Sequence, residues 1–393
     1  MSNFFLYLIY VCFVMYGWVA SLLGGVWPSL SKDIGTNISM LGILVMINYA
    51  TSGISSLFTY KIRMKLGTNF TTIFGLICAS ISMVLFANAS SFILLSISVV
   101  FLGIGSGIID INSNSYVVKA YDTKRVSFMH ACWGLGATIG PMVMSFAMIH
   151  LPNYRYGFYF TFIILLIAII FLLFAKKYWE KKKKSLDESF VKLHSVTKEE
   201  IGKETNLLGI LKIKNAVKIS MCFFFANGAG CSLSAWLATM VVEQRGINYT
   251  EATFAASIFF FALMVGRIFF GILSSKCGIS FVMKLCAALS TIFAICYYIP
   301  YNNFIIVLLH SALIGFSSGS IIPLLNANTK DLFEEKYISK IIGIGGAVGL
   351  AGIALISALM TFIVNILTIN NIQIVQIISF ALIFILYYSI EKK

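Results

Sequence analysis

Long apolar runs follow one another along almost the whole chain, and short polar segments separate them. Each run holds about 20 residues or more, which at about 1.5 Å per residue is enough to cross a hydrocarbon core about 30 Å thick. The pattern predicts an all-α polytopic membrane protein. Twelve transmembrane helices are expected, at residues 4–30, 38–60, 69–88, 92–118, 124–149, 157–175, 215–242, 250–275, 279–299, 303–329, 336–365 and 371–390.

The composition agrees with a chain whose main solvent is lipid. Hydrophobic residues make up 59% and charged residues 11%, against about 45–50% and 25% in soluble domains, and the mean hydropathy is +0.92. The first apolar run resembles a signal peptide in length. No basic segment precedes it and no small-residue cleavage site follows, so we expect it to be retained as the first helix.

The net charge of +14 could indicate binding to nucleic acid or could reflect membrane topology. The placement of the basic residues distinguishes the two. The connections after odd-numbered helices hold Lys32, Arg155 and Arg245 alone. The connections after even-numbered helices and the C-terminus hold Lys61, Arg63, Lys65, Lys119, Lys124, Arg125, Lys176, Lys177, Lys181 to Lys184, Lys276, Lys330, Lys336, Lys340, Lys392 and Lys393. The positive-inside rule then places both termini in the cytoplasm. We expect a monomer in the inner (plasma) membrane of a bacterium, with no nucleic-acid partner.

One long polar segment divides the predicted helices into two sets of six. We expect an N-terminal six-helix bundle at 1–175, a cytoplasmic linker at 176–214 and a C-terminal six-helix bundle at 215–393. The linker opens with a Lys-rich run, which suits contact with anionic lipid headgroups; a regulatory segment is the alternative.

The two halves also resemble each other in sequence, which predicts pseudo-symmetric bundles. At an offset of 212 residues, Gly103, Gly107 and Asn114 recur as Gly315, Gly319 and Asn326; at 209 residues, Trp27, Gly134, Gly136 and Gly140 recur as Trp236, Gly343, Gly345 and Gly349. Glycines four residues apart let helix backbones approach closely in lipid. They could serve packing alone, or also let one bundle rock against the other.

Asp110 is the one carboxylate of fifteen that lies away from loops, tails and helix ends. It precedes Lys119 by nine residues, roughly 13 Å along a helix. A charged aspartate at that depth is costly unless it faces a cavity, finds a partner or takes up a proton. Asp110 is therefore a candidate proton-coupling residue, and the alternative is a permanently paired or neutral Asp that ties two helices together.

Side chains near Asp110 could complete a polar site. His130 is expected at a similar depth on the next helix, where the two groups would titrate as a unit if they meet; a packing histidine is the alternative. Asn114 lies one turn from Asp110 and Trp133 one turn from His130. A carboxylate, an amide and an indole suit a hydroxyl-rich solute such as a sugar, although amides and tryptophans are also ordinary packing residues in membranes.

The second half offers fewer candidates. Arg267 is the other charge inside a predicted span, and we expect a gating or structural role for it. Asn227 and Asn326 could face a substrate-binding cavity from this half. The eight cysteines include no CxxC pair, and we interpret them as packing residues. We expect no metal and no cofactor.

Two loop segments resemble a signature of the major facilitator superfamily. In residues 266–278, Gly266 and Arg267 end a helix, and Gly271, small polar residues and Lys276 precede Gly278. The resemblance implies a structural or gating role for Arg267, Gly271 and Gly278. Gly134, on the glycine-rich face of the fifth helix, is a candidate for the same role. The first-half copy, residues 53–67, keeps its basic residues and lacks the usual Asp.

Within that superfamily, helices 4 and 5 are similar to those of sugar carriers of the fucose-proton symporter type. Asp110 through Tyr116 looks like their acid-x-x-x-Asn-x-Tyr stretch, and Arg125 through Pro141 looks like their helix 5 signature. The resemblance implies proton coupling at Asp110 and solute contacts at His130 and Trp133.

The sequence therefore predicts a secondary transporter and no enzyme. Our first hypothesis is alternating-access symport of a proton, or another cation, with a small polar organic solute, most simply a sugar. The alternatives are an efflux antiporter of amphipathic compounds and a membrane sensor without transport. A membrane enzyme would need several acids, a metal site or a nucleophile with its base, and the chain has one deep Asp and no metal-ligand spacing.

Overall fold

The chain folds into helices throughout the part that the computed structural model describes, residues 3–120, 123–174, 209–210 and 212–390. Most of the predicted linker, 176–214, lies outside these residues. The helices of the first half are α1 (Asn3–Asp33), α2 (Leu41–Ala87), α3 (Phe92–Ala120), α4 (Thr123–His150) and α5 (Tyr156–Phe174). Those of the second half are α8 (Ala216–Arg245), α9 (Tyr249–Cys277), α10 (Ile279–Tyr298), α11 (Phe304–Ser318), α12 (Ile321–Leu332), α13 (Glu335–Ile366) and α14 (Ile372–Tyr388).

Twelve spans are present, as predicted, but two of them are arranged differently. Helix α2 has 47 residues and covers two spans, which meet at a kink where the backbone of Gly67 is not helical (φ 78°, ψ 165°). The tenth span, Phe304–Leu332, is interrupted at Gly319 and Ser320 and so forms α11 and α12. The described residues contain no β-strand, and the predicted all-α polytopic fold is confirmed.

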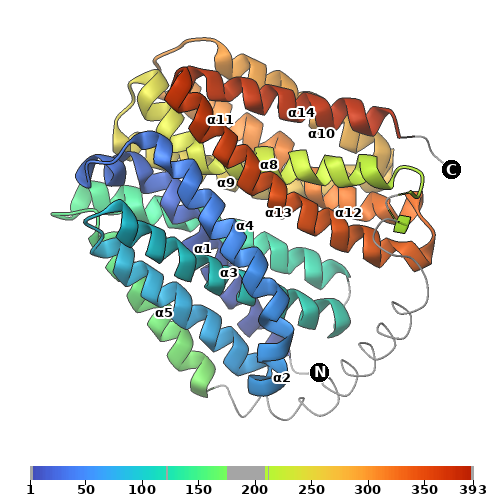
Figure 1. The fold of residues 1–393 in the computed structure, drawn as a ribbon, viewed down its shortest axis with the longest axis horizontal. Coiled ribbons are helices and arrows are strands. Elements are labelled where there is room, and N and C mark those ends of the chain that lie inside the picture. The colour runs from blue at the N-terminus through green and yellow to red at the C-terminus, as the bar shows by residue number, and fades with distance from the viewer. Residues whose placement is uncertain (1–2, 121–122, 175–208, 211, 391–393) are drawn as a thin grey trace.

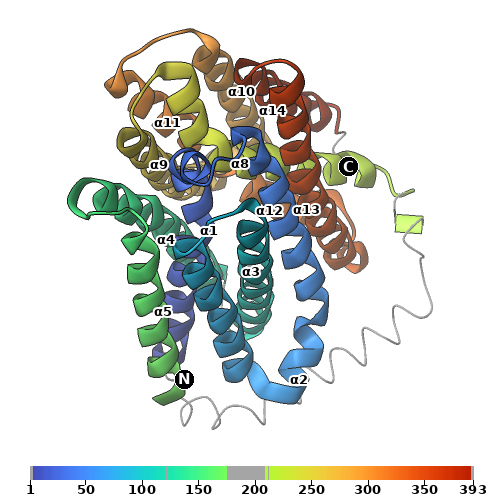
Figure 2. The same ribbon diagram turned by 60° about the vertical axis from the view of Figure 1, so that its left-hand side comes forward.

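The helices form two groups that follow the order of the chain. Helices α1 to α5, blue to green, make one group, and helices α8 to α14, yellow to red, make the other (Figures 1 and 2). The broadest contacts join α2 to α3 and α1 to α4 in the first half, and α9 to α11 and α8 to α13 in the second. We call the end of the molecule that holds the α1–α2 connection the Asp33 end and the opposite end the Gly67 end.

Glycine allows the closest of these helix contacts. A Cβ at Gly107 would lie 2.3 Å from the carbonyl oxygen of Ser52 in α2, and one at Gly319 would lie 2.5 Å from the carbonyl oxygen of Leu263 in α9. Most of the matched glycines thus serve packing inside each half. Gly134 and Gly343 are exceptions, since a Cβ at Gly134 would meet Met264 of the other half and one at Gly343 would meet nothing within 4 Å.

The backbone confirms the internal repeat independently of side chains. Gly35 and Gly246 both have φ of 63°, and Gly67 and Gly278 have φ of 78° and 86°. Each pair is separated by 211 residues, and each member reverses the chain between two spans. Such φ values favour glycine, because a Cβ would crowd the backbone.

The two halves are bonded to each other near the Asp33 end. Hydroxyl groups donate to backbone oxygens across the interface: Thr253 to Gly25 (2.7 Å), Thr361 to Ser39 (2.7 Å) and Ser145 to Thr250 (3.2 Å). The backbones also approach closely there, since a Cβ at Gly24 would lie 2.7 Å from Cα of Ala235. This end of the interface is therefore closed.

Candidate functional site

Asp110 and Asn114 form a bonded pair on α3. The Nδ2 amide of Asn114 donates to Oδ1 of Asp110 at 2.8 Å, as the one-turn spacing predicts. Both side chains are half-buried. No cation lies within ion-pair distance of the Asp110 carboxylate among the described residues. The carboxylate is therefore held by a neutral donor and keeps some accessible surface.

Arg267 on α9 is bonded at the interruption between α11 and α12. Pro323 has no N–H, so the carbonyl four residues earlier, at Gly319, loses its helical donor. Nε of Arg267 donates to that oxygen at 3.0 Å. Ser320 makes the reverse link from the same interruption, since its hydroxyl donates to the carbonyl of Gly266 at 2.9 Å. The proline thus explains both the interrupted helix and the position of Arg267.

Trp133 on α4 contacts the second half in the middle of the molecule. Cζ of Arg267 lies 5.5 Å from the centroid of the Trp133 ring, within the range of a cation–π contact. Phe260 of α9 and Tyr16 of α1 approach the same indole edge-on, with centroids at 6.1 and 6.2 Å. Aromatic side chains from both halves therefore meet at the Trp133 ring, beside which the guanidinium group of Arg267 lies.

His130 lies near Arg267 rather than against Asp110. Its ring meets Phe13 of α1 edge-on at 5.7 Å, and Arg267 is close enough to act on it electrostatically. The side chain is exposed although both halves flank it. No hydrogen bond or ion pair joins it to Asp110 in the described part of the chain, because α3 packs mainly on α2 and α4 mainly on α1.

The predicted asparagines of the second half differ in their surroundings. Nδ2 of Asn227 donates to the carbonyl of Phe223 in its own helix at 3.0 Å, and Gly349 packs against its amide. This geometry is typical of a packing residue at the contact between α8 and α13. Asn326 is half-buried on α12.

The predicted gating glycines occupy three different environments. A Cβ at Gly134 would lie 3.1 Å from Cβ of Met264, so Gly134 lies where α4 meets α9 of the other half. Gly271 faces open space, with nothing within 4 Å of a Cβ. Gly278 is needed for its φ of 86° at the α9–α10 connection.

Sequence reasoning missed several neighbours of this site. Tyr16 lies within electrostatic range of Asp110 and Cys231, and the Tyr49 side chain of α2 faces Cys231 of α8 across the interface. All are half-buried. Tyrosine hydroxyls on otherwise apolar helices were the available signal.

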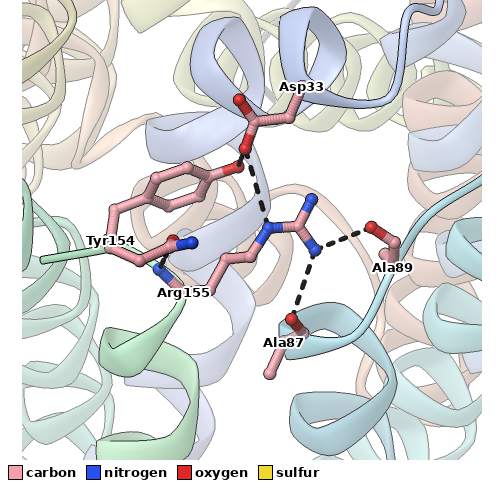
Figure 3. A network of polar contacts seen from close by, with 6 residues as sticks. Asp33, Ala87, Ala89, Tyr154 and Arg155 are labelled. Atoms are coloured by element: carbon pink, nitrogen blue, oxygen red, sulfur yellow. Dashed lines mark hydrogen bonds and ion pairs between the residues drawn. The ribbon is translucent and has the colours of Figure 1, made fainter.

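A polar network joins three connections of the first half at the Asp33 end (Figure 3). Oδ2 of Asp33 accepts from the Tyr154 hydroxyl at 2.6 Å and lies 3.6 Å from Nε of Arg155. Nη1 of Arg155 donates to the carbonyls of Ala87 (3.2 Å) and Ala89 (2.7 Å). Burial and the bond to Asp33 raise the pKa of Tyr154 well above its usual range, so the phenol stays a donor.

A pocket of about 400 Å³ opens beside this network, between the two halves. It is lined by Ser29, Asp33, Met148, Leu151, Pro152, Asn153, Tyr154, Tyr249 and Thr250. Nζ of Lys32 lies 5.7 Å from the Tyr249 ring centroid.

The second half has a different arginine at the Asp33 end. Arg245 ends α8, is 6% exposed, and donates from Nη2 to the carbonyl of Tyr297 at the end of α10. Its Cζ lies 4.9 Å from the Tyr297 ring centroid and 4.2 Å from that of Tyr301. His310 stacks on the Tyr301 ring at 4.9 Å.

Two repeated bundles of spanning helices, with half-buried polar groups where they meet, define a membrane transport protein of the two-bundle class. The sequence profile described as Major Facilitator Superfamily matches residues 9–255 and, a second time, residues 219–393. The chain belongs to the Major Facilitator Superfamily.

Solved structures support the fold. A D-xylose-proton symporter superposes with a TM-score of 0.77 at 14% identity, covering 98% of this chain and 97% of the other. A peptide transporter POT in complex with sulfate superposes with a TM-score of 0.71 at 16% identity, covering 98% and 92%. A comparison with proteins of curated function found no match.

Proposed function

We propose that this superfamily member is a proton-coupled symporter of a small, hydroxyl-rich organic solute of the sugar type, working by alternating access between its two halves. The observation that carries the proposal is the environment of Asp110. This carboxylate lies in the middle of a span, keeps accessible surface and is held by one amide. No cation among the described residues pairs with it, so proton uptake and release there meet no competing ion pair.

The polar and aromatic groups between Asp110 and the interface of the two halves support a polar solute. Asn114 offers an amide, Tyr16 and Tyr49 offer hydroxyls, and Trp133 offers an indole face; all four are half-buried. Amides and hydroxyls bind sugar hydroxyls, and aromatic rings pack on the apolar faces of sugar rings. The xylose-proton symporter among the similar structures is in keeping with this solute class. His130 adds a second titratable group on the same side of the interface.

The proposed cycle follows from where the halves touch. The Asp33 end is closed by hydroxyl-to-carbonyl bonds, and breaking them would open that side while the Gly67 end closes. With the distribution of Lys and Arg, we place the Gly67 end and both termini in the cytoplasm of a bacterium. The protein would act as a monomer, with its boundaries at residues 175 and 215 between bundles and linker.

Proteoliposome transport tests the proposal through Asp110. Asp110→Asn keeps an amide-sized partner for Asn114 and removes the titratable group. Proton uptake that accompanies solute entry should vanish in this variant, while exchange of labelled solute across the membrane survives. Asp331→Asn, which changes an exposed carboxylate at the end of α12, is the matched control and should keep both activities.

Coupling that persists in Asp110→Asn would refute the assignment of the proton site. Loss of exchange as well as coupling, with an unchanged melting temperature, would assign Asp110 to solute binding instead.

A further inference from the structure

We infer that the solute carries a carboxylate, that Arg267 binds it, and that the carrier therefore moves a hydroxylated organic acid of the sugar-acid type together with one proton. This inference rests on the proposed function and narrows its substrate class. Three features of Arg267 carry it: the symmetry of the fold, the donors that remain open, and the absence of a described acidic partner.

The internal repeat provides a comparison for Arg267. The position 211 residues earlier is Ser56, and the counterpart of Gly319 is Gly107. Ser56 Oγ donates to the carbonyl of Ser52 in its own helix at 2.8 Å and lies 3.4 Å from the carbonyl oxygen of Gly107, whereas Nε of Arg267 donates to the carbonyl of Gly319 at 3.0 Å. A neutral hydroxyl thus occupies the corresponding place beside the glycine carbonyl in the first half. Satisfying a backbone carbonyl does not require a cation.

Most donors of Arg267 are not used by the protein. One N–H, on Nε, is bonded to Gly319. Neither Nη group bonds to a described residue or counts among the buried atoms that lack a partner, so both remain accessible. The bond to Gly319 and the Trp133 ring at 5.5 Å hold the guanidinium plane in place. A held plane with two free Nη groups is the geometry that binds a carboxylate through two parallel hydrogen bonds.

The charge of Arg267 is uncompensated within the described chain. Asp33 pairs with Arg155 at the Asp33 end, and Asp110 bonds to Asn114, so neither carboxylate pairs with Arg267. A cation in the middle of a span is costly without a partner. An anionic solute would supply that partner each time the site is loaded, which selects against a neutral analogue that leaves the charge unpaired.

The charges are placed unequally on the repeated scaffold. Arg267 of the second half corresponds to Ser56, and Asp110 of the first half corresponds to Ile322 at the 212-residue offset. The first half therefore contributes the acidic residue and the second half the basic residue. With Asp110 protonated and Arg267 paired to a carboxylate, both central groups are neutralised. One anion and one proton move together, and the net charge transported is zero.

Electrogenicity of uptake by the purified, reconstituted protein tests the inference without any substitution. The probes are two matched pairs, D-glucuronate with D-glucose and D-galacturonate with D-galactose. A pH gradient should drive uptake of a uronate but not of its parent sugar, and an imposed membrane potential should leave the uronate rate unchanged. A neutral sugar moving with a proton would instead be accelerated by a negative interior.

Variants of Arg267 add a binding readout, the thermal stabilisation of purified protein by each probe. Arg267→Lys keeps the charge and loses the paired donors, so uronate affinity should fall about tenfold or more. Arg267→Gln should weaken it further. Lys276→Gln, which removes a charge nine residues further along α9, is the control and should bind as the wild type does.

The outcomes separate this inference from the proposed function. Potential-driven uptake of a parent sugar, with no response to its uronate, would overturn the inference and leave proton-coupled sugar transport standing. No stabilisation and no uptake with any of the four probes would overturn both. Uronate binding that Arg267→Lys and Arg267→Gln leave unchanged would overturn the role of Arg267.

Discussion

Arg155 and Arg245 both hold a helix connection at the Asp33 end, one in each half, and they do so by different means. Arg155 is 18% exposed in its side chain, pairs with a carboxylate that is 41% exposed, and bonds two carbonyls. Arg245 is 6% exposed and lies between tyrosine rings, with one carbonyl bond and no described acidic partner.

The difference shows how burial decides the value of a charge contact. Water and salt screen the exposed pair in the first half, so its attraction is weak. In the second half the rings exclude water, and a desolvated cation–π contact is stronger than an exposed one. Because water is excluded there, removing Arg245 should cost more stability, since its neighbours pack around a buried cation.

The largest effect is expected from Arg245→Ala. The substitution removes contacts to two rings and a charge-assisted bond, and should destabilise the protein by about 3 kcal/mol. The measurement is the apparent melting temperature in detergent, with Arg245→Lys as an intermediate control. A fall no larger than that of Arg155→Ala would remove the distinction between the two arginines.

A smaller effect is expected in the first half. Arg155→Ala loses two carbonyl bonds and should cost about 1–2 kcal/mol, and Asp33→Asn should cost less than about 1 kcal/mol because the pair is exposed. Raising salt to about 0.5 M should bring Asp33→Asn closer to the wild type, while the deficit of Arg245→Ala stays constant. Equal salt responses at the two sites would contradict the comparison.

The smallest effect concerns pH. Burial raises the pKa of Tyr301, in the α10–α11 connection, from 10.0 to about 12, and Arg245 opposes the shift. The folded state then holds this proton more tightly than the unfolded state, so the contribution of Tyr301 to stability is constant below about pH 10 and is lost between about pH 10 and 12. Tyr301→Phe should make the melting temperature fall less over that range; an identical fall in both proteins would exclude Tyr301 as a contributor.

The sequence predicted the parts of this fold that depend on pattern. Apolar run length predicted the twelve spans, and the glycine offsets predicted the repeat that Gly67 and Gly278 confirm. The bond between Asp110 and Asn114 followed from helical spacing. These features are local, or repeat at a constant interval, and so can be read along a chain.

Contacts between elements far apart in the chain were harder to predict from the sequence. Asp110 and His130 were expected at similar depths on adjacent helices, where they could meet, but helix packing in each half joins the second span to the fourth and the first to the fifth. The interruption at Gly319 had a signal in Pro323, four residues later. Nothing in the sequence indicated that Arg267 would donate to the carbonyl of Gly319, because the two residues are 52 positions apart in the chain.

The interruption between α11 and α12 also has a mechanical consequence. A continuous helix transmits a tilt along its whole length, whereas two segments joined at an interruption can tilt separately. The tenth span therefore consists of two helical segments that can tilt separately about the interruption at Gly319 and Ser320. Arg267 is bonded at this interruption, so α12 can tilt at the Gly67 end while α11 stays packed on α9.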